Sequence, residues 1–218
     1  MLHLRNWRVS RLIKLLVISG SPTPQSSTDL LLHAASDALV EALRPTHHAE
    51  VSFIKLNDLQ FIPCQSCGKA PHEEWCVFHD DVSPVLDQLA DCDCLLVGSP
   101  IYFDSVSAQL KLLMDRCNCF RPADFDKVDP EHDFIRRIKS KRPGGMVLVG
   151  GENGWFEGAR RAIAGFFIWI EVTNEGVVTY KSKDFHRAGE AADSQTTLDE
   201  ARELGKKLAA ILKERHAG

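Results

Sequence analysis

Short, nearly continuous apolar runs recur along the chain and alternate with segments of helical spacing. The first run, 12–19, is interrupted by Lys14 and is otherwise apolar up to Ser19. A strand that helices cover on both faces must be apolar at almost every position, and the run has this pattern. Five such runs predict five strands, at residues 12–19, 51–56, 94–99, 145–150 and 177–181.

Between these runs, apolar residues recur at the spacing of amphipathic helices. The first helix is expected to follow Ser26-Ser27-Thr28, which offers N-caps, and to end before Pro45. Thr197-Leu-Asp-Glu200 has the form of a capping box and predicts the start of the last helix. The other helices are expected after Ser83, over 108–116 and over 157–170.

Strands that alternate with helices predict one doubly wound α/β domain over residues 12–218, with a five-stranded parallel sheet. Residues 1–11 are expected to form an N-terminal extension. The polar, proline-bearing segment 120–142 is expected to be a long surface insertion. In such a sheet, ligands bind beyond the carboxyl ends of the strands, where the strand order reverses.

Charge and composition narrow the classes of partner. A net charge of −4 gives no broad positive field for nucleic acid. The apolar stretch 163–170 is far shorter than the ~20 residues of a membrane span, and no cleavage site follows the early apolar run. Seven cysteines, an odd number, do not resemble a disulfide framework. We therefore expect a cytoplasmic protein with neither a nucleic-acid nor a membrane partner.

The loop after the first strand carries many hydroxyl groups and leads into a helix N-terminus, which favours an anion. It reads Gly20-Ser21-Pro22-Thr23-Pro24-Gln25-Ser26-Ser27-Thr28. It lacks both the Gly-Lys-Ser/Thr of a nucleoside-triphosphate loop and the spaced glycines of a dinucleotide fingerprint. A neutral hydroxyl cradle suits the phosphate of FMN better than ATP. Taken alone, however, the same hydroxyls could serve only to cap the helix.

Two further loops leave strands at the same predicted edge of the sheet. Gly98-Ser99-Pro100-Ile101-Tyr102-Phe103 presents flat aromatic groups against which an isoalloxazine ring could rest. Gly150-Gly151-Glu152-Asn153-Gly154-Trp155 allows close backbone approach, and its N–H groups could stabilise negative charge on a flavin. The alternative for this glycine run is a plain turn with a surface tryptophan.

Three motifs together resemble the NADPH-dependent FMN reductases and iron–sulfur flavoproteins of the flavodoxin superfamily. They are Gly20-Ser21-Pro22, Gly98-Ser99-Pro100-Ile101-Tyr102 and Leu110-Lys111-Leu112-Leu113-Met114-Asp115-Arg116. The resemblance implies a flavodoxin-like three-layer fold with strand order 2-1-3-4-5. By the resemblance, the residues around the FMN phosphate are Ser19, Ser21, Ser26, Ser27 and Thr28, and those that line the ring are Pro100, Ile101, Tyr102 and Phe103. The neighbouring Pro22 and Ser99 complete these two loops, and the place of the third loop after a strand adds Gly150, Gly151, Glu152, Asn153 and Gly154. No catalytic side chain is expected, because the sequence shows no Ser-His-Asp, Cys-His or paired-carboxylate arrangement.

The function that this resemblance implies is FMN-dependent oxidoreduction in which NAD(P)H gives a hydride to FMN and an unidentified small-molecule or protein acceptor takes the electrons. A homodimer or homotetramer is expected. Two alternatives remain open, a non-enzymatic FMN electron carrier and a regulatory protein that keeps the fold without the cofactor. Lys111, Asp115 and Arg116 are expected to be structural or to lie at a subunit contact.

A cysteine-bearing loop follows the second predicted strand. Cys64, Cys67 and Cys76 resemble the segment in which iron–sulfur flavoproteins place four cluster-binding cysteines, but Ala70 stands where another would fall. A four-iron cluster normally takes four thiolates. The candidates for the missing ligand are His72, Cys92, Cys94 and a second chain.

The three thiols could instead bind zinc with a histidine, exchange a disulfide, or be remnants of the family pattern. The remnant reading is favoured, and we expect no stoichiometric iron–sulfur cluster. Four further cysteines lie beside apolar residues and are expected to be small buried hydrophobic groups: Cys92, Cys94, Cys117 and Cys119.

Overall fold

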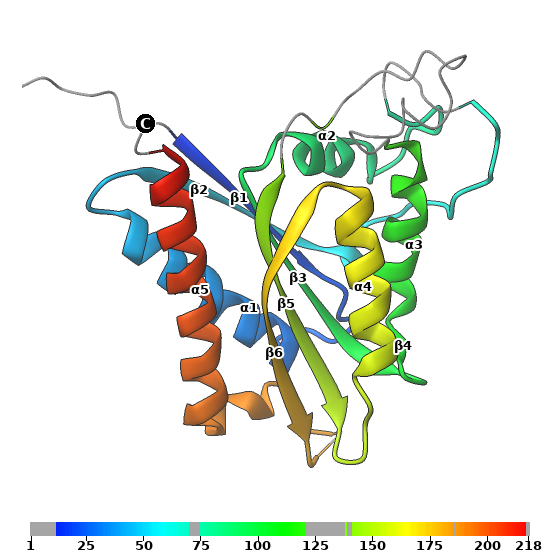
Figure 1. The fold of residues 1–218 in the computed structure, drawn as a ribbon. Coiled ribbons are helices and arrows are strands. Elements are labelled where there is room, and N and C mark those ends of the chain that lie inside the picture. The colour runs from blue at the N-terminus through cyan, green and yellow to red at the C-terminus, as the bar shows by residue number, and fades with distance from the viewer. Residues whose placement is uncertain (1–11, 70–74, 121–137, 139–140, 185, 217–218) are drawn as a thin grey trace, which may run out of the picture.

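The computed structural model describes residues 12–69, 75–120, 138, 141–184 and 186–216. In this part of the chain, helices cover both faces of a sheet with five parallel strands (Figure 1). The strand order is β2-β1-β3-β5-β6, the order of a flavodoxin-like sheet, so the predicted fold is confirmed. The strands are β1 (Leu12–Ser19), β2 (His48–Lys55), β3 (Cys94–Tyr102), β5 (Arg142–Gly151) and β6 (Val172–Ser182).

The helices form two layers, each with its own apolar core. α1 (Ser27–Leu43) and α5 (Gln195–His216) pack on one face. α2 (Ser83–Asp91), α3 (Ala108–Arg116) and α4 (Glu157–Trp169) cover the other (Figure 1). None of the described helices is long and apolar enough to cross a membrane.

The two helices of the first layer approach each other closely at one glycine. A Cβ atom built on Gly205 of α5 would lie 2.0 Å from the carbonyl oxygen of Ala35 on α1. Any larger residue at 205 would push the helices apart, because neither atom can move independently of the backbone: the Cβ atom is bonded to the Cα atom, and the oxygen belongs to a peptide group. The small residue therefore sets how tightly α1 and α5 cover the sheet.

Four of the five parallel strands begin earlier or end later than the sequence predicted: the central strands β3 and β5 and both edge strands. β2 begins at His48 and β6 at Val172, and the added residues are mostly polar or partly exposed. An edge strand has neighbours on one side only, so its apolar pattern is weaker than that of a central strand. The sequence also missed β4 (Ser105–Val106), a two-residue strand that pairs antiparallel with the end of β3.

The last helix begins before the predicted capping box, so that prediction is wrong. α5 starts at Gln195, and the Ser194 hydroxyl accepts a hydrogen bond from Thr197 N at 3.4 Å. Ser194 also bonds to the Thr197 hydroxyl at 2.8 Å. Thr197 is thus already inside the first turn, because a serine three residues earlier offers the same capping chemistry.

The predicted surface insertion 120–142 is wrong at its two ends. Phe120 is fully buried, Ile138 is buried in the same core, and Arg142 is the buried first residue of β5. Residues 121–137 and 139–140, like the predicted extension 1–11, lie outside the described residues. The apolar core therefore continues into what the polar composition had suggested was surface.

Candidate functional site

A pocket lies at the carboxyl edge of the sheet, between the loops that follow four of its strands. In Figure 1 this edge is at the bottom of the view, where the arrowheads of β5 and β6 end. Its wall contains Ser21, Thr23, Ser26, Ser27 and Thr28 after β1, Pro100, Ile101 and Tyr102 at the end of β3, Val149, Gly150 and Gly151 at the end of β5, and Ser182, Asp184, His186, Arg187, Ala188 and Gly189 after β6.

The loop after β1 is held in shape by one buried carboxylate. Ser26 is the N-cap of α1, and its hydroxyl accepts from Asp29 N at 3.1 Å while Asp29 Oδ2 accepts from Ser26 N at 3.2 Å. The Ser19 hydroxyl donates to Asp29 Oδ1 at 2.5 Å. Ser19 is fully buried, so it stabilises the loop from the core side and does not line the pocket.

The capping and phosphate-binding alternatives for the hydroxyl cluster are compatible with each other. Ser26 caps the helix and still lines the pocket. The Ser27 hydroxyl accepts from Ala191 N at 3.1 Å, and Thr28 adds a third hydroxyl to the wall. The first N–H groups of a helix have no partner within the helix, so this end of α1 also offers backbone donors to an anion.

The end of β3 forms another part of the pocket wall. Pro100, Ile101 and Tyr102 line the pocket, and Tyr102 is about half exposed. Ser99 is buried behind them, where its hydroxyl donates to Pro100 O at 2.7 Å and accepts from Ser107 N at 2.9 Å. The predicted ring-binding turn is thus present, with Ser99 as its support.

The tip of the β3–β4 turn has a strained backbone. Phe103 has φ of 51° and Asp104 of 57°, in a region that residues other than glycine adopt rarely. Asp104 Oδ1 accepts from Gly158 N at 3.2 Å, which anchors the tip to the start of α4. Phe103 is fully exposed and lies outside the pocket wall.

The glycine-rich loop after β5 contributes only its first residues. Gly150 and Gly151 line the pocket, whereas Glu152, Asn153 and Gly154 do not. Gly154 N donates to Gly151 O at 2.8 Å, which closes a tight turn. Both alternatives for this run therefore apply, since the turn carries backbone of the wall and leaves Trp155 exposed.

Sequence reasoning missed the loop between β6 and α5, which supplies a whole side of the pocket. Glu190 fixes its shape by accepting from the Ser182 hydroxyl at 2.5 Å and from Lys183 N at 3.0 Å. The bond from Ser182 lowers the pKa of Glu190, against the opposing effect of burial. Arg187 forms an ion pair with Asp193 at 2.5 Å. The sequence could have indicated this loop only by its position, because it also follows the carboxyl end of a strand.

Of the expected site residues, nine line the pocket: Ser21, Ser26, Ser27, Thr28, Pro100, Ile101, Tyr102, Gly150 and Gly151. The others lie behind or beside the wall: Ser19, Pro22, Ser99, Phe103, Glu152, Asn153 and Gly154. The pocket residues fit FMN, since the wall offers neutral hydroxyls at a helix N-terminus together with Arg187 and His186, and also the half-exposed aromatic surface of Tyr102.

The cysteines fall into two groups. Cys92, Cys94 and Cys117 are buried in the core, as expected, and burial raises their thiol pKa values, that of Cys92 to about 11. Cys119 is buried in the same core, also as expected, and in addition it lines a second pocket with Cys64, Cys67 and Cys76 beside Arg116. Among the described residues, no three His, Cys, Asp or Glu side chains are arranged to hold a metal ion. Ala70 and His72 lie outside these residues.

Comparisons with known proteins agree with this geometry. The family model of NADPH-dependent FMN reductases matches residues 13–178. An iron–sulfur flavoprotein of Methanocaldococcus jannaschii is 32% identical over 206 residues, which cover 92% of this chain and 98% of that protein.

Two solved structures resemble the fold. A flavone reductase superposes with a TM-score of 0.68 at 20% identity over 94% of this chain, which spans only 65% of that protein. The apo form of an NADH:FMN oxidoreductase superposes with a TM-score of 0.64 at 15% identity, covering 94% of this chain and 92% of that one.

Proposed function

The chain belongs to the family of NADPH-dependent FMN reductases and is an FMN oxidoreductase, and from this premise we propose that NADH or NADPH supplies its electrons. A second, unidentified substrate then takes them. The observation that carries the proposal is one pocket whose wall contains both a hydroxyl-rich helix N-terminus and the Pro100-Ile101-Tyr102 surface.

The residues of the pocket bind and orient in this proposal. Ser21, Ser26, Ser27 and Thr28 hold the phosphate, since neutral hydroxyls and helix N–H groups can donate to it together. Ile101 and Tyr102 face the ring system, and the backbone of Gly151 approaches it without a side chain in the way. Bound FMN supplies the hydride chemistry, so the protein needs no acid or base of its own.

The pocket rim supports the proposed homodimer or homotetramer. Phe103 directly follows the wall residue Tyr102, and Trp155 lies four residues after the wall residue Gly151. Both are strongly exposed, an unusual position for large aromatic side chains in a monomer. A second copy of the chain would cover them and narrow the access to the pocket. Sedimentation is expected to give a dimer or tetramer at micromolar concentration, and a monomer throughout that range would count against this assembly.

The experiment combines a cofactor measurement with a turnover measurement. Flavin released from the purified protein is identified by mass spectrometry, and the refilled protein is mixed with NADPH or NADH without oxygen while flavin bleaching is followed. The proposal requires bound FMN and bleaching faster than that of free FMN. FMN that only a chemical reductant bleaches would favour the electron carrier, and apoprotein that takes up no flavin would favour the cofactor-free regulator.

A further inference from the structure

The second pocket, which we call the thiol pocket, is lined by Cys64, Cys67, Cys76 and Cys119 together with Arg116. Its cysteines come from two separate segments of the chain. Cys64 and Cys67 lie in the loop that follows β2, and Cys76 lies in the same loop just ahead of α2. The fourth thiol, Cys119, comes from the short helix η2 (Cys117–Cys119) directly after α3. The fold therefore gathers four cysteines around one pocket, although the sequence offers only three in the loop.

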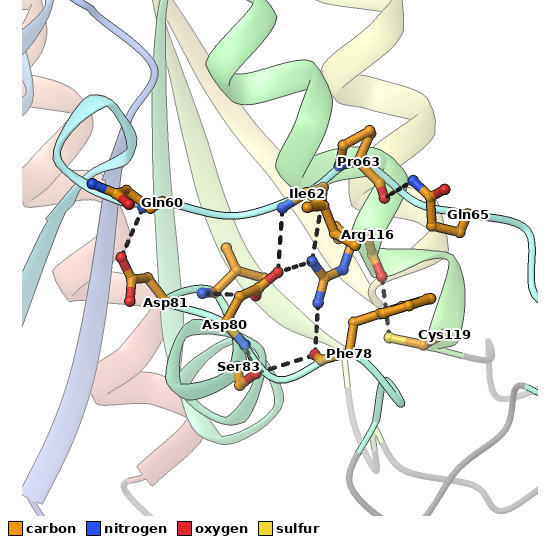
Figure 2. A network of polar contacts seen from close by, with 11 residues as sticks. Gln60, Ile62, Pro63, Gln65, Phe78, Asp80, Asp81, Ser83, Arg116 and Cys119 are labelled. Atoms are coloured by element: carbon orange, nitrogen blue, oxygen red, sulfur yellow. Dashed lines mark hydrogen bonds and ion pairs between the residues drawn. The ribbon is translucent and has the colours of Figure 1, made fainter.

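Arg116 fixes both limbs of the cysteine loop against α3. Its Nη1 donates to Ile62 O at 3.0 Å and to Asp80 Oδ2 at 2.5 Å, and its Nη2 donates to Phe78 O at 3.0 Å. Figure 2 shows the guanidinium between the stretch with Ile62 and the stretch with Phe78 and Asp80, with Cys119 close by. The limbs that carry Cys64 and Cys76 thus have a fixed relation to the turn that carries Cys119.

One polar atom at this pocket lacks a partner. Arg116 is 1% exposed and lines the pocket, yet its Nε has no hydrogen-bond partner among the described residues. Its guanidinium is charged, as arginine side chains are in proteins. A buried, charged donor without an acceptor is rare in native structures and indicates that an anionic acceptor belongs beside it.

The arrangement does not suit a single metal ion. Zinc requires its ligands to converge on one point, and no three such side chains do so in the described part of the chain. The pocket volume of about 190 Å³ is also far larger than the ~10–15 Å³ that one water-sized group needs. A four-iron cluster is a larger body that takes one thiolate at each iron, so its cysteines stand apart around it.

We propose that Cys119 supplies the thiolate that is missing at position 70, so that Cys64, Cys67, Cys76 and Cys119 hold a four-iron, four-sulfide cluster. Each thiol loses its proton as its iron–sulfur bond forms. Arg116 Nε would be available to donate to a sulfur atom of such a cluster. Four thiols are therefore available in place of the three expected from the loop, because Cys119, although buried in the core, also lines the pocket.

The test is reconstitution of the apoprotein with ferrous iron and sulfide without oxygen, followed by iron and sulfide analysis and electron paramagnetic resonance. The parent protein is expected to take up about four irons and four sulfides per chain. Cys119→Ser leaves one iron without a thiolate, so mild oxidation is expected to convert its cluster to a three-iron form with a distinct resonance signal. Cys117→Ala, two residues away in the core, is the matched control and keeps four irons.

A second variant guards against a folding defect in Cys119→Ser. Ala70→Cys added to Cys119→Ser restores the fourth thiolate of the family motif and is expected to restore the four-iron cluster. The proposal is overturned if the parent protein takes up no cluster, if it takes up one zinc ion in its place, or if Cys119→Ser keeps all four irons through mild oxidation. None of these readouts depends on flavin or turnover, so the proposed oxidoreductase function can fail or stand separately.

Discussion

Lys55 and Asp29 form a largely buried ion pair under the first loop of the flavin pocket, with Lys55 Nζ 2.6 Å from Asp29 Oδ2. Their side chains are 16% and 9% exposed. Lys55 is the last residue of β2, and its Nζ also donates to Thr23 O at 2.9 Å. Because Asp29 also binds Ser19 and Ser26, one carboxylate connects two strands, the loop and the start of α1.

Asp29→Ala is expected to lower the free energy of unfolding by about 3 kcal/mol, since it leaves a largely buried ammonium group without its partner. Urea unfolding of the apoprotein measures this. The matched control is Asp199→Ala, which removes an aspartate paired with Arg202 on the exposed face of α5. That variant should unfold at the parent's midpoint. Equal midpoints for all three proteins would show that the pair under the loop does not support the fold.

The sequence predicted the parts of the fold that repeat a strong pattern. The strand β1 and helix α3 have the predicted bounds, because β1 is buried at every position except Leu12 and Lys14 and the buried leucines of α3 recur at helical spacing. The edge strand β6 was underestimated because its first half, including Asn174 and Glu175, is polar. Composition alone does not reveal a strand whose stability comes from its hydrogen-bonded neighbour.

The sequence predicted the site where a loop has both a chemical pattern and a known place in the fold. Ser26 and Tyr102 lie in such loops and line the pocket. Arg187 and Cys119 lie in segments without a motif, and tertiary packing brings them to their pockets. Ser19 and Ser99 belong to the motifs that predicted the site, but they do not line the pocket. Their hydroxyls instead donate to Asp29 and to the Pro100 carbonyl oxygen, and these bonds stabilise the two loops.

Ser21→Asp is expected to weaken FMN binding by roughly 100-fold or more, because a carboxylate in the wall would face the phosphate with little solvent between them. Fluorescence titration of the apoprotein measures the dissociation constants of FMN and riboflavin. Riboflavin lacks the phosphate, so its binding should change much less. Ser21→Ala serves as the neutral comparison. If Ser21→Asp binds FMN as tightly as the parent, Ser21 does not contact the phosphate.

Glu190→Gln is expected to destabilise the protein near neutral pH, and this destabilisation is expected to disappear in acid. The Ser182 hydroxyl lowers the pKa of Glu190 below its ordinary value of 4.5, so the carboxylate is more stable in the folded state. Its contribution is therefore complete above 4.5 and is lost as the pH falls through the lowered pKa. Thermal unfolding of both proteins across this range measures the difference. A difference that stays constant with pH would contradict this role.

Arg187→Ala is expected to raise the dissociation constant of FMN by roughly fivefold while that of riboflavin stays the same, because Arg187 is the arginine in the pocket wall and its ion pair with Asp193 is exposed and screened. The effect should shrink as salt is added. Arg202→Ala is the matched control, since Arg202 pairs with Asp199 away from the pocket. Equal weakening of FMN and riboflavin would mean that Arg187 shapes the loop and does not recognise the phosphate.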